Sequence, residues 1–290
     1  MNPGIAYALG AYTLWGLFPL YFKLLEHVPA LQILAHRMVW SLLLVLLILL
    51  ALRRFAWLTR VDRSVVARFA LSAALLSCNW GTYIWAVNHD HVVEASLGYY
   101  INPLLNVALG TLLLHERLRA LQWGAVAVAC VGVLWMTIEL GHVPWIALVL
   151  ALSFGGYSLA RKTAPLGSLE GLALETALLF PLALLYLGWC SAHGSNAFSA
   201  GDGAQRALLA AAGPVTTIPL LLFAAGARRI PLSMLGLLQY LTPTLLLVLG
   251  VWLYHEPFSS TRATGFGLVW AGIALYMLDG LLRRRVAATA

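Results

Sequence analysis

The feature that most constrains this chain is a series of apolar blocks, each near 20 residues long, separated by short polar turns. An α-helix needs about 20 apolar residues to cross roughly 30 Å of hydrocarbon. Charged residues make up only 10% of the chain and the mean hydropathy is +0.85, whereas a water-soluble fold carries about 25% charged residues. The chain is therefore predicted to be an all-α integral membrane protein.

Ten such blocks follow one another, and each predicts one transmembrane helix. The predicted helices span residues 4–24, 31–52, 68–88, 91–113, 120–140, 143–162, 169–190, 206–227, 231–254 and 263–282. No basic segment precedes the first block, so we expect it to be retained as a span instead of being cleaved as a signal peptide. The connection at 191–205 is small and polar, which predicts a flexible surface loop with no functional signal.

The basic residues lie mainly in alternate loops between the blocks. Fourteen of the 18 lysines and arginines fall on one side of the membrane, at Arg53, Arg54, Arg60, Arg63, Arg68, Arg117, Arg119, Arg161, Lys162, Arg228, Arg229, Arg283, Arg284 and Arg285. Loops rich in Lys and Arg stay in the cytoplasm, so both termini are predicted to be cytoplasmic, with 191–205 outside. The net charge of +7 therefore reflects the basic residues that orient the chain in the membrane. Because the sequence has no nucleic-acid-binding motif, we expect no nucleic acid partner.

Residues that hold metals or carry out nucleophilic catalysis are not grouped at useful spacings. The three cysteines lack metal-ligand spacing, and no Walker A sequence is present. His115-Glu116 and His255-Glu256 resemble half of a zinc-protease motif but lack its second histidine, so we interpret them as helix-terminal residues. We expect no metal, no cofactor and no enzymatic activity.

The chain contains an internal repeat with an offset of 140 residues, at which the fourth predicted helix aligns with the ninth. Leu97, Tyr100, Pro103, Leu105, Leu109, Gly110, Leu113, His115 and Glu116 align with Leu237, Tyr240, Pro243, Leu245, Leu249, Gly250, Leu253, His255 and Glu256. Gly132 aligns with Gly272 at the same offset. We therefore predict two domains, five-helix repeats at 1–142 and 143–290.

Each repeat holds an odd number of spans, so the second copy must enter the membrane in the opposite orientation. Inverted repeats are common in secondary transporters, because the two halves can exchange conformations around a central site. Pro103 and Pro243 lie mid-span at equivalent positions and predict a hinge or kink, since proline removes a helical hydrogen bond. Such paired interruptions favour a substrate site beside them; a kink that serves packing alone is the alternative.

Several motifs in the first four predicted helices are distinctive. They are Trp15-Gly16, Pro19, Leu34-Ala35-His36-Arg37, Trp40-Ser41, Asn79-Trp80, Tyr83-Ile84-Trp85-Ala86-Val87-Asn88 and the run from His91 to Leu104. These motifs resemble the RarD family of EamA-type drug/metabolite transporters. The resemblance implies ten spans, location in the bacterial plasma (inner) membrane, and export of small organic molecules, with an association with chloramphenicol sensitivity. The small multidrug relatives couple transport to protons through a Glu in the first helix; this chain has none there.

Charged residues inside predicted spans are costly and are functional candidates by default. Arg37, roughly 10 Å below the outer face, is a candidate to bind a substrate carboxylate or other anion through its planar fork. The alternative is a structural ion pair with Glu94 or Asp90. Glu175 is a candidate proton carrier or ligand for a substrate amine, with a satisfied interhelical hydrogen bond as the alternative. His36 is interpreted as a packing residue near the outer face.

Aromatic and amide side chains supply the rest of the candidate site. The predicted substrate-binding residues, besides Arg37 and Glu175, are Trp15, Asn79, Tyr83, Tyr99, Asn102, Gln239 and Tyr240. Aromatic walls with a few amides suit a planar or amphiphilic solute held by stacking and sparse hydrogen bonds. Helix–helix packing is the alternative interpretation of the same stripe.

These observations favour a secondary transporter, a permease that exports small organic solutes by alternating access. Metabolites, amino-acid-like compounds and amphenicol-like compounds are the expected solutes. We expect a small organic solute and membrane lipid as partners, and a monomer. A membrane-embedded enzyme would need a nucleophile with a base, and a channel would favour pore-lining rings or filter loops; both remain as alternatives.

Overall fold

The computed structural model describes residues 2–89, 91–138, 142–253 and 260–289, which form helices joined by short turns. The helices are α1 (Pro3–Gly16), α2 (Phe18–Lys23), α3 (Ala30–Ala51), α4 (Arg63–Asn88), α5 (Val92–Leu113), α6 (Ala120–Ile138), α7 (Trp145–Thr163), α8 (Ser168–Ala192), α9 (Ala197–Ala200), α10 (Gly203–Ala227), α11 (Leu232–Gln239), α12 (Leu241–Val248) and α13 (Ser260–Thr289). A 3₁₀ turn, η1 (Ala56–Arg60), precedes α4, and a π turn, η2 (Leu249–Leu253), follows α12.

Six segments of the described chain are long and apolar enough to cross a membrane. They are Pro3–Lys23, Ala30–Ala51, Ala120–Ile138, Ser168–Ala192, Gly203–Ala227 and Leu232–Leu253. The remaining predicted spans coincide with α4, α5, α7 and α13, which are helical over the predicted lengths. Large apolar side chains such as Leu47 of α3 and Leu185 of α8 are more than half exposed. The sequence-based prediction of an all-helical chain is thus confirmed.

Two of the predicted spans are interrupted. The first breaks at Leu17, between α1 and α2, and the ninth breaks at Tyr240, between α11 and α12. Pro243 explains the second break, because proline has no N–H for the carbonyl four residues earlier. In contrast, α5 stays helical through Pro103. Of the two predicted hinge positions, only Pro243 therefore lies beside an interruption.

The connection at 191–205 differs from the predicted flexible loop. It contains the short helix α9, and the amide of Gln32 on α3 bonds to it twice. Gln32 Nε2 donates to the carbonyl of Ser195 at 2.7 Å, and Gln32 Oε1 accepts from the backbone N–H of Ala197 at 2.8 Å. The ring of Phe198 stacks on His36, with 5.3 Å between the ring centroids. Side chains of α3 therefore hold this connection in place.

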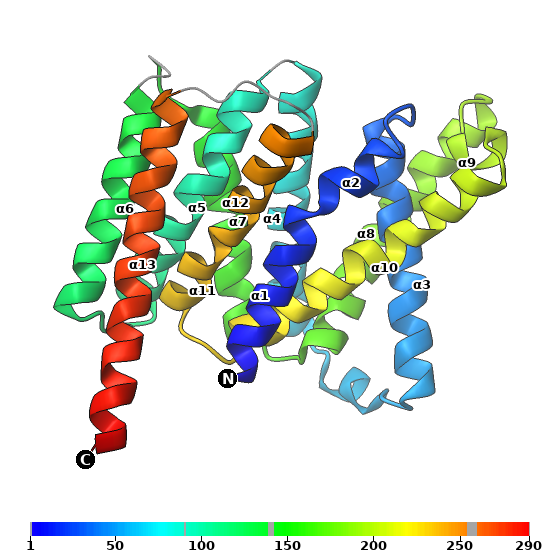
Figure 1. The fold of residues 1–290 in the computed structure, drawn as a ribbon. Helices are drawn as coiled ribbons and strands as arrows, with labels where there is room; N and C mark the ends of the chain where they lie inside the picture. The colour runs from blue at the N-terminus through cyan, green and yellow to red at the C-terminus, as the bar shows by residue number, and fades with distance from the viewer. Residues whose placement is uncertain (1, 90, 139–141, 254–259, 290) are drawn as a thin grey trace.

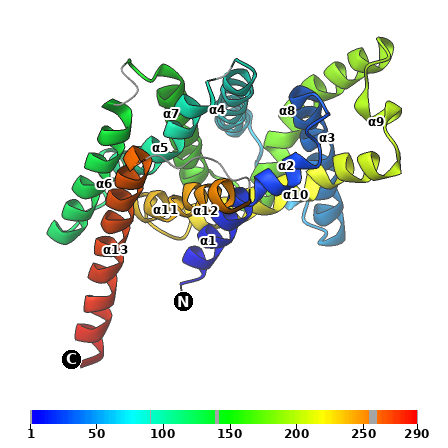
Figure 2. The ribbon, with the colours of Figure 1, turned by 45° about the horizontal axis from the view of Figure 1, so that its top comes forward.

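The helices are arranged so that α6 and α13 pair at one end of the molecule, while α3, α8 and α10 pack together at the other (Figures 1 and 2). Between these ends, α5 packs against α7 and α11, and α1 packs against α10 and α12. The start of α1 and the end of α13 lie on the same side of the molecule (Figure 1).

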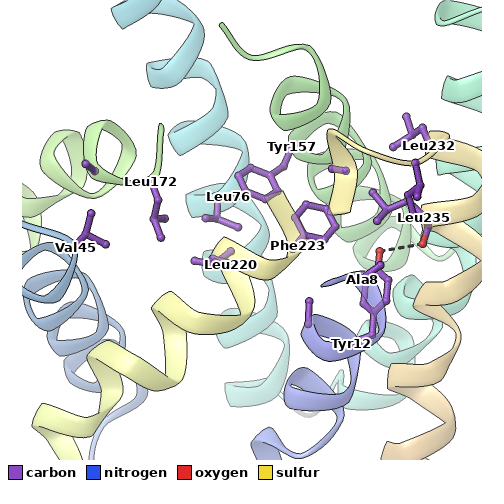
Figure 3. Close-up of a cluster of buried hydrophobic side chains, with 14 of the residues drawn as sticks. Ala8, Tyr12, Val45, Leu76, Tyr157, Leu172, Leu220, Phe223, Leu232 and Leu235 are labelled. Atoms are coloured by element: carbon purple, nitrogen blue, oxygen red, sulfur yellow. Dashed lines mark hydrogen bonds between the residues drawn. The ribbon is translucent and has the colours of Figure 1, made fainter. Parts of the chain in front are cut away.

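A core of buried rings fills the space between α1, α7, α10 and α11 (Figure 3). The rings of Tyr157 and Phe223 stack at 5.9 Å, and Tyr12 meets Phe223 edge-on at 6.2 Å. The hydroxyl of Tyr12 donates to the carbonyl of Leu235 at 3.0 Å, the bond drawn in Figure 3. The same cluster reaches Ala8, near the start of α1. This core fills the middle of the molecule on the side where both chain ends lie.

Candidate functional site

A cavity of about 500 Å³ lies among α1, α2, α3, α4, α5, α7, α10, α11 and α12. This volume falls within the range of about 300–1,000 Å³ that is usual for sites of small organic ligands. Its lining includes the end of α1, much of α2, the first half of α3 and of α5, the second half of α4 and the middle of α7. The cavity therefore occupies the half of the molecule opposite the chain ends. Lys23, which also lines it, has 60% of its side chain exposed and marks the mouth.

Seven of the nine predicted substrate-binding residues line this cavity. They are Trp15, Arg37, Asn79, Tyr83, Tyr99, Asn102 and Gln239. They come from five helices, so the fold gathers side chains that are far apart in the sequence. Glu175 and Tyr240 do not line it: Glu175 lies elsewhere, and Tyr240 is fully buried, with its hydroxyl donating to the carbonyl of Tyr100 at 3.1 Å. The predicted hinge residues Pro103 and Pro243 each follow a lining residue, Asn102 and Thr242.

The guanidinium of Arg37 is held on one side of the cavity. Its Nε donates to the hydroxyl of Thr216 on α10 at 2.8 Å. Its Cζ lies 4.5 Å from the centroid of the Trp80 ring, 5.6 Å from that of Phe22 and 5.8 Å from that of Phe18. A cation over aromatic rings is stabilised by their electron-rich faces. The fold thus presents a fixed positive group to the cavity.

The suggested ion pair of Arg37 with Glu94 is not formed. Glu94 is buried, and its Oε1 accepts a hydrogen bond from the backbone N–H of Ile146 at 2.8 Å. Ile146 is the second residue of α7, where unpaired N–H groups and the helix dipole attract a carboxylate. Asp90, the other suggested partner, lies outside the described residues.

Amide groups from three helices line the cavity. Asn79 donates through Nδ2 to the carbonyl of Leu150 at 2.9 Å and to Ser153 Oγ at 3.2 Å. Its Oδ1 is thereby oriented away from those partners and is available as an acceptor. Gln239 Oε1 accepts from Asn106 Nδ2 at 3.2 Å. Within the described part of the chain, the buried Oδ1 of Asn102 has no hydrogen-bond partner. These groups are fixed polar positions in an otherwise aromatic cavity.

The aromatic lining divides into rings that belong to the core and rings that do not. Trp15 contacts Tyr12, Phe154 and Phe223 with ring centroids 5.4–5.8 Å apart, so it joins the floor of the cavity to the buried core. Tyr83 is 38% exposed and meets Tyr99 edge-on at 6.1 Å. Tyr83 is therefore more open to a ligand than Trp15 is.

On the side of the chain ends, Glu116 connects α5, which it follows, with α7 and α11. Its Oε1 accepts from the backbone N–H of Leu232 at 2.6 Å, and its Oε2 accepts from the N–H and Oγ of Ser233 at 2.9 and 2.7 Å. Lys162, at the end of α7, lies 3.9 Å from Oε1 and donates to the carbonyl of Ile230 at 2.6 Å. The interpretation of Glu116 as a helix-terminal residue is extended: it also caps α11. His255 and Glu256, its repeat equivalents, lie outside the described residues.

Glu175 belongs to a second buried cluster, separate from the cavity. Arg161 Nη1 lies 3.4 Å from Glu175 Oε1, both side chains are 1% exposed, and Ser72 Oγ donates to the same oxygen. Arg161 Nη2 also donates to the carbonyl of Ser168 at 3.0 Å. Arg161 was counted with the basic residues of the loops, but it lies within α7 and is buried in the helix packing. For Glu175, the structure favours the interhelical alternative over contact with a solute.

Some cavity residues escaped the sequence-based selection. The rings of Phe18, Phe22 and Trp80 surround Arg37. Each lies in an apolar block, where the sequence does not distinguish an aromatic residue that faces lipid from one that faces the protein interior. Trp80 directly follows Asn79 in one of the distinctive motifs, which was the available signal. Thr242 lines the cavity at the repeat position of Asn102, so the 140-residue offset also pointed to it.

Comparison with known proteins agrees with the fold and the repeat offset. The EamA-like transporter family matches two stretches of the chain, residues 2–138 and 143–278. Protein RarD of Streptomyces exfoliatus is 50% identical over 284 residues, covering 97% of this chain and 90% of the relative. Protein RarD of Escherichia coli (strain K12) is 40% identical, covering 97% of this chain and 96% of the relative.

A solved crystal structure with 22% sequence identity covers 95% of this chain and 97% of that chain with a TM-score of 0.68, so the two share a fold. The resemblance to RarD inferred from the motifs is confirmed by relatives that match almost the whole chain. The chain is a multi-pass membrane transporter that belongs to the EamA-like transporter family, among its RarD-type members.

Proposed function

We propose that this protein is a secondary transporter that exports small organic solutes across the bacterial inner membrane by alternating access. Ten spans form two inverted repeats, 1–142 and 143–290, and both termini are cytoplasmic. The solute binds in the cavity beside Arg37, and membrane lipid surrounds a monomer. The observation that carries the proposal is a ligand-sized cavity open on one side and sealed on the other by a buried core.

The helix pairings support two repeats related by a pseudo-twofold axis. At the 140-residue offset, α1 with α2 corresponds to α7, α3 to α8, α4 to α10, α5 to α11 with α12, and α6 to α13. The packing of α1 on α10 then corresponds to that of α7 on α4, and both pairs are in contact. Exchange of the two repeats leaves three contacting pairs unchanged, as expected for helices that meet at the axis. These pairs are α3 with α8, α5 with α11, and α6 with α13. This symmetry is the usual basis of rocking between two states.

The asymmetry between the two faces supports an outward-facing state. Lys23 at the mouth is exposed, whereas Tyr12 and Phe223 beneath the cavity are completely buried. On the opposite face, Glu116 fixes the start of α11 to the end of α5. Rocking of the halves would break these contacts and open the cavity toward the cytoplasm.

Flux through the cavity is the direct test. A thermal-shift screen of purified protein against amino acids, aromatic metabolites and amphenicols would select a solute for counterflow in proteoliposomes. Phe18→Cys, in a background without Cys78, Cys130 and Cys190, places a thiol at the cavity wall. We expect saturable counterflow that stops when this thiol carries a bulky maleimide.

Ser199→Cys is the matched control, because Ser199 is exposed on α9, outside the cavity. Labelling at this position should leave counterflow intact. Non-saturable flux without counterflow would indicate a channel, and chemical conversion of the solute without translocation would indicate an enzyme; either result would reject the proposal.

A further inference from the structure

Among the residues that the structure describes, the positive charge of Arg37 in the cavity has no negative counterpart. Arg37 forms no ion pair with the described acidic residues, and none of these residues lines the cavity wall. The second cationic lining residue, Lys23, pairs with Glu26 at 3.0 Å at the exposed mouth. A charged side chain within a span is costly unless it is paired or hydrated. The interior of the cavity is therefore electropositive around Arg37.

The groups around Arg37 compensate its charge only in part. Trp80, Phe22 and Phe18 place ring faces against the guanidinium, and Thr216 accepts its Nε–H. The terminal nitrogens Nη1 and Nη2 donate no hydrogen bond to the described residues, and neither is sealed off within the protein. Three rings and one hydroxyl thus fix the group in place while its hydrogen-bonding edge remains open to the cavity.

A carboxylate is the group that best matches this edge. The planar guanidinium donates two parallel N–H bonds to the two oxygens of a carboxylate, and such charge-assisted pairs are stronger than neutral hydrogen bonds. Within a partly dehydrated cavity the preference over a neutral amide of the same shape increases. An ammonium group would be repelled by Arg37 and would find no acidic side chain among the described lining residues.

The other residues of the cavity wall indicate the chemistry of the rest of the ligand. Tyr83 and Tyr99 provide ring surfaces beside Arg37 for a flat apolar body. Asn79 offers an acceptor oxygen for one N–H or O–H of that body. We propose that the transported solute is an organic anion, a carboxylate attached to an aromatic or similarly planar body, and that Arg37 binds its carboxylate. This assignment rests on the proposed function, since it names the solute class of the same cavity.

A series of probes that share one phenyl ring isolates the contribution of charge. The probes are 3-phenylpropanoate (anion), 3-phenylpropanamide (neutral), L-phenylalanine (zwitterion) and 2-phenylethylamine (cation). Binding to the full-length protein in detergent is measured by isothermal titration calorimetry, and translocation by counterflow in proteoliposomes. We expect the anion to bind about 10- to 100-fold more tightly than the neutral amide, and the cation to bind most weakly.

Variants of Arg37 assign the preference to this residue. Arg37→Met should reduce the affinity for 3-phenylpropanoate to that for the amide, while the affinity for the amide changes little. Arg37→Lys keeps the charge without the fork and should give an intermediate value. Arg206→Gln is the control, because Arg206 lies exposed on α10 and bonds only to the carbonyls of Phe198 and Ser199. The Arg206 variant should retain the preference for the anion.

Each result either supports or overturns the proposal that the solute is an organic anion bound by Arg37. Equal binding of anion and amide by the wild type, equal anion binding by Arg37→Met and wild type, or no binding of the anion would overturn the inference. Counterflow of the neutral or cationic probe as fast as the anion, still blocked by the label at Phe18→Cys, would leave the transporter proposal standing and reject the anion. Tight, Arg37-dependent binding without counterflow would support the anion site and reject transport.

Discussion

The hydroxyl of Tyr240 donates a hydrogen bond to the backbone carbonyl of Tyr100, 3.1 Å away and 140 residues earlier in the chain. These two residues are equivalent positions at the 140-residue offset, so in the proposed two-repeat arrangement a contact between them would lie at the axis that relates the two halves. Both side chains are buried in a cluster that also contains apolar residues of α6 and α13. If the halves rock as proposed, a contact at the axis would change least.

Tyr240→Phe removes this bond and keeps the ring. We expect the free energy of unfolding to fall by about 1 kcal/mol, with the transport rate per folded molecule unchanged. Thermal unfolding in detergent and counterflow measure the two quantities. Tyr7→Phe is the control, since a Phe ring still lies beneath Arg229. A lost transport rate at normal stability would mean that the bond forms in one conformation only.

The two repeat-related glycines Gly132 and Gly272 lie where α6 meets α13. A Cβ at Gly132 would come within 2.8 Å of the carbonyl oxygen of Gly265, and a Cβ at Gly272 within 2.7 Å of that of Ala125. We expect Gly132→Ala and Gly272→Ala each to separate the helices and to cost about 1–3 kcal/mol. Gly267→Ala on α13 meets nothing within 4 Å and should be neutral or stabilising in thermal unfolding. Equal stability of all three variants would contradict this packing.

The buried pair of Arg161 and Glu175 should act in stability instead of solute binding. Glu175→Ala leaves a buried guanidinium without its counter-charge, and about 3–5 kcal/mol should be lost. The double change Arg161→Met with Glu175→Leu removes both charges and should restore most of the thermal stability. The double variant should bind solute as the wild type does, because neither residue lines the cavity. Loss of binding in this stable double variant would assign Glu175 to the transport pathway after all.

The proposed orientation is tested by single cysteines at Ser64 and Ser195, both exposed, in a background without the native cysteines. An impermeant thiol reagent added to intact cells should label Ser195→Cys and spare Ser64→Cys. Both positions should be labelled once the cells are opened. The reverse pattern in intact cells would invert the topology.

The sequence by itself determined the helices and the repeat. A run of about 20 apolar residues has few alternatives in a bilayer, since every backbone N–H and C=O must be satisfied within the segment. The apolar blocks therefore predicted α3, α6, α8 and α10 within a few residues. The constant offset of Tyr100 and Tyr240 likewise required no knowledge of packing. Helix breaks were harder, because Pro103 and Pro243 have the same local chemistry and only the second lies beside a break.

Only the tertiary structure decided which polar residues meet. Arg37 bonds to Thr216, 179 residues away, and lies against Trp80, while Glu94 turns to the start of α7. From the sequence, Glu94 was a reasonable partner for Arg37 and no partner was predicted for Arg161, because depth in the membrane limits a partner without selecting it. Helix rotation and crossing make that selection, and they are set by close contacts between side chains across the whole bundle. The same packing places Tyr99 at the cavity and its neighbour Tyr100 in the core.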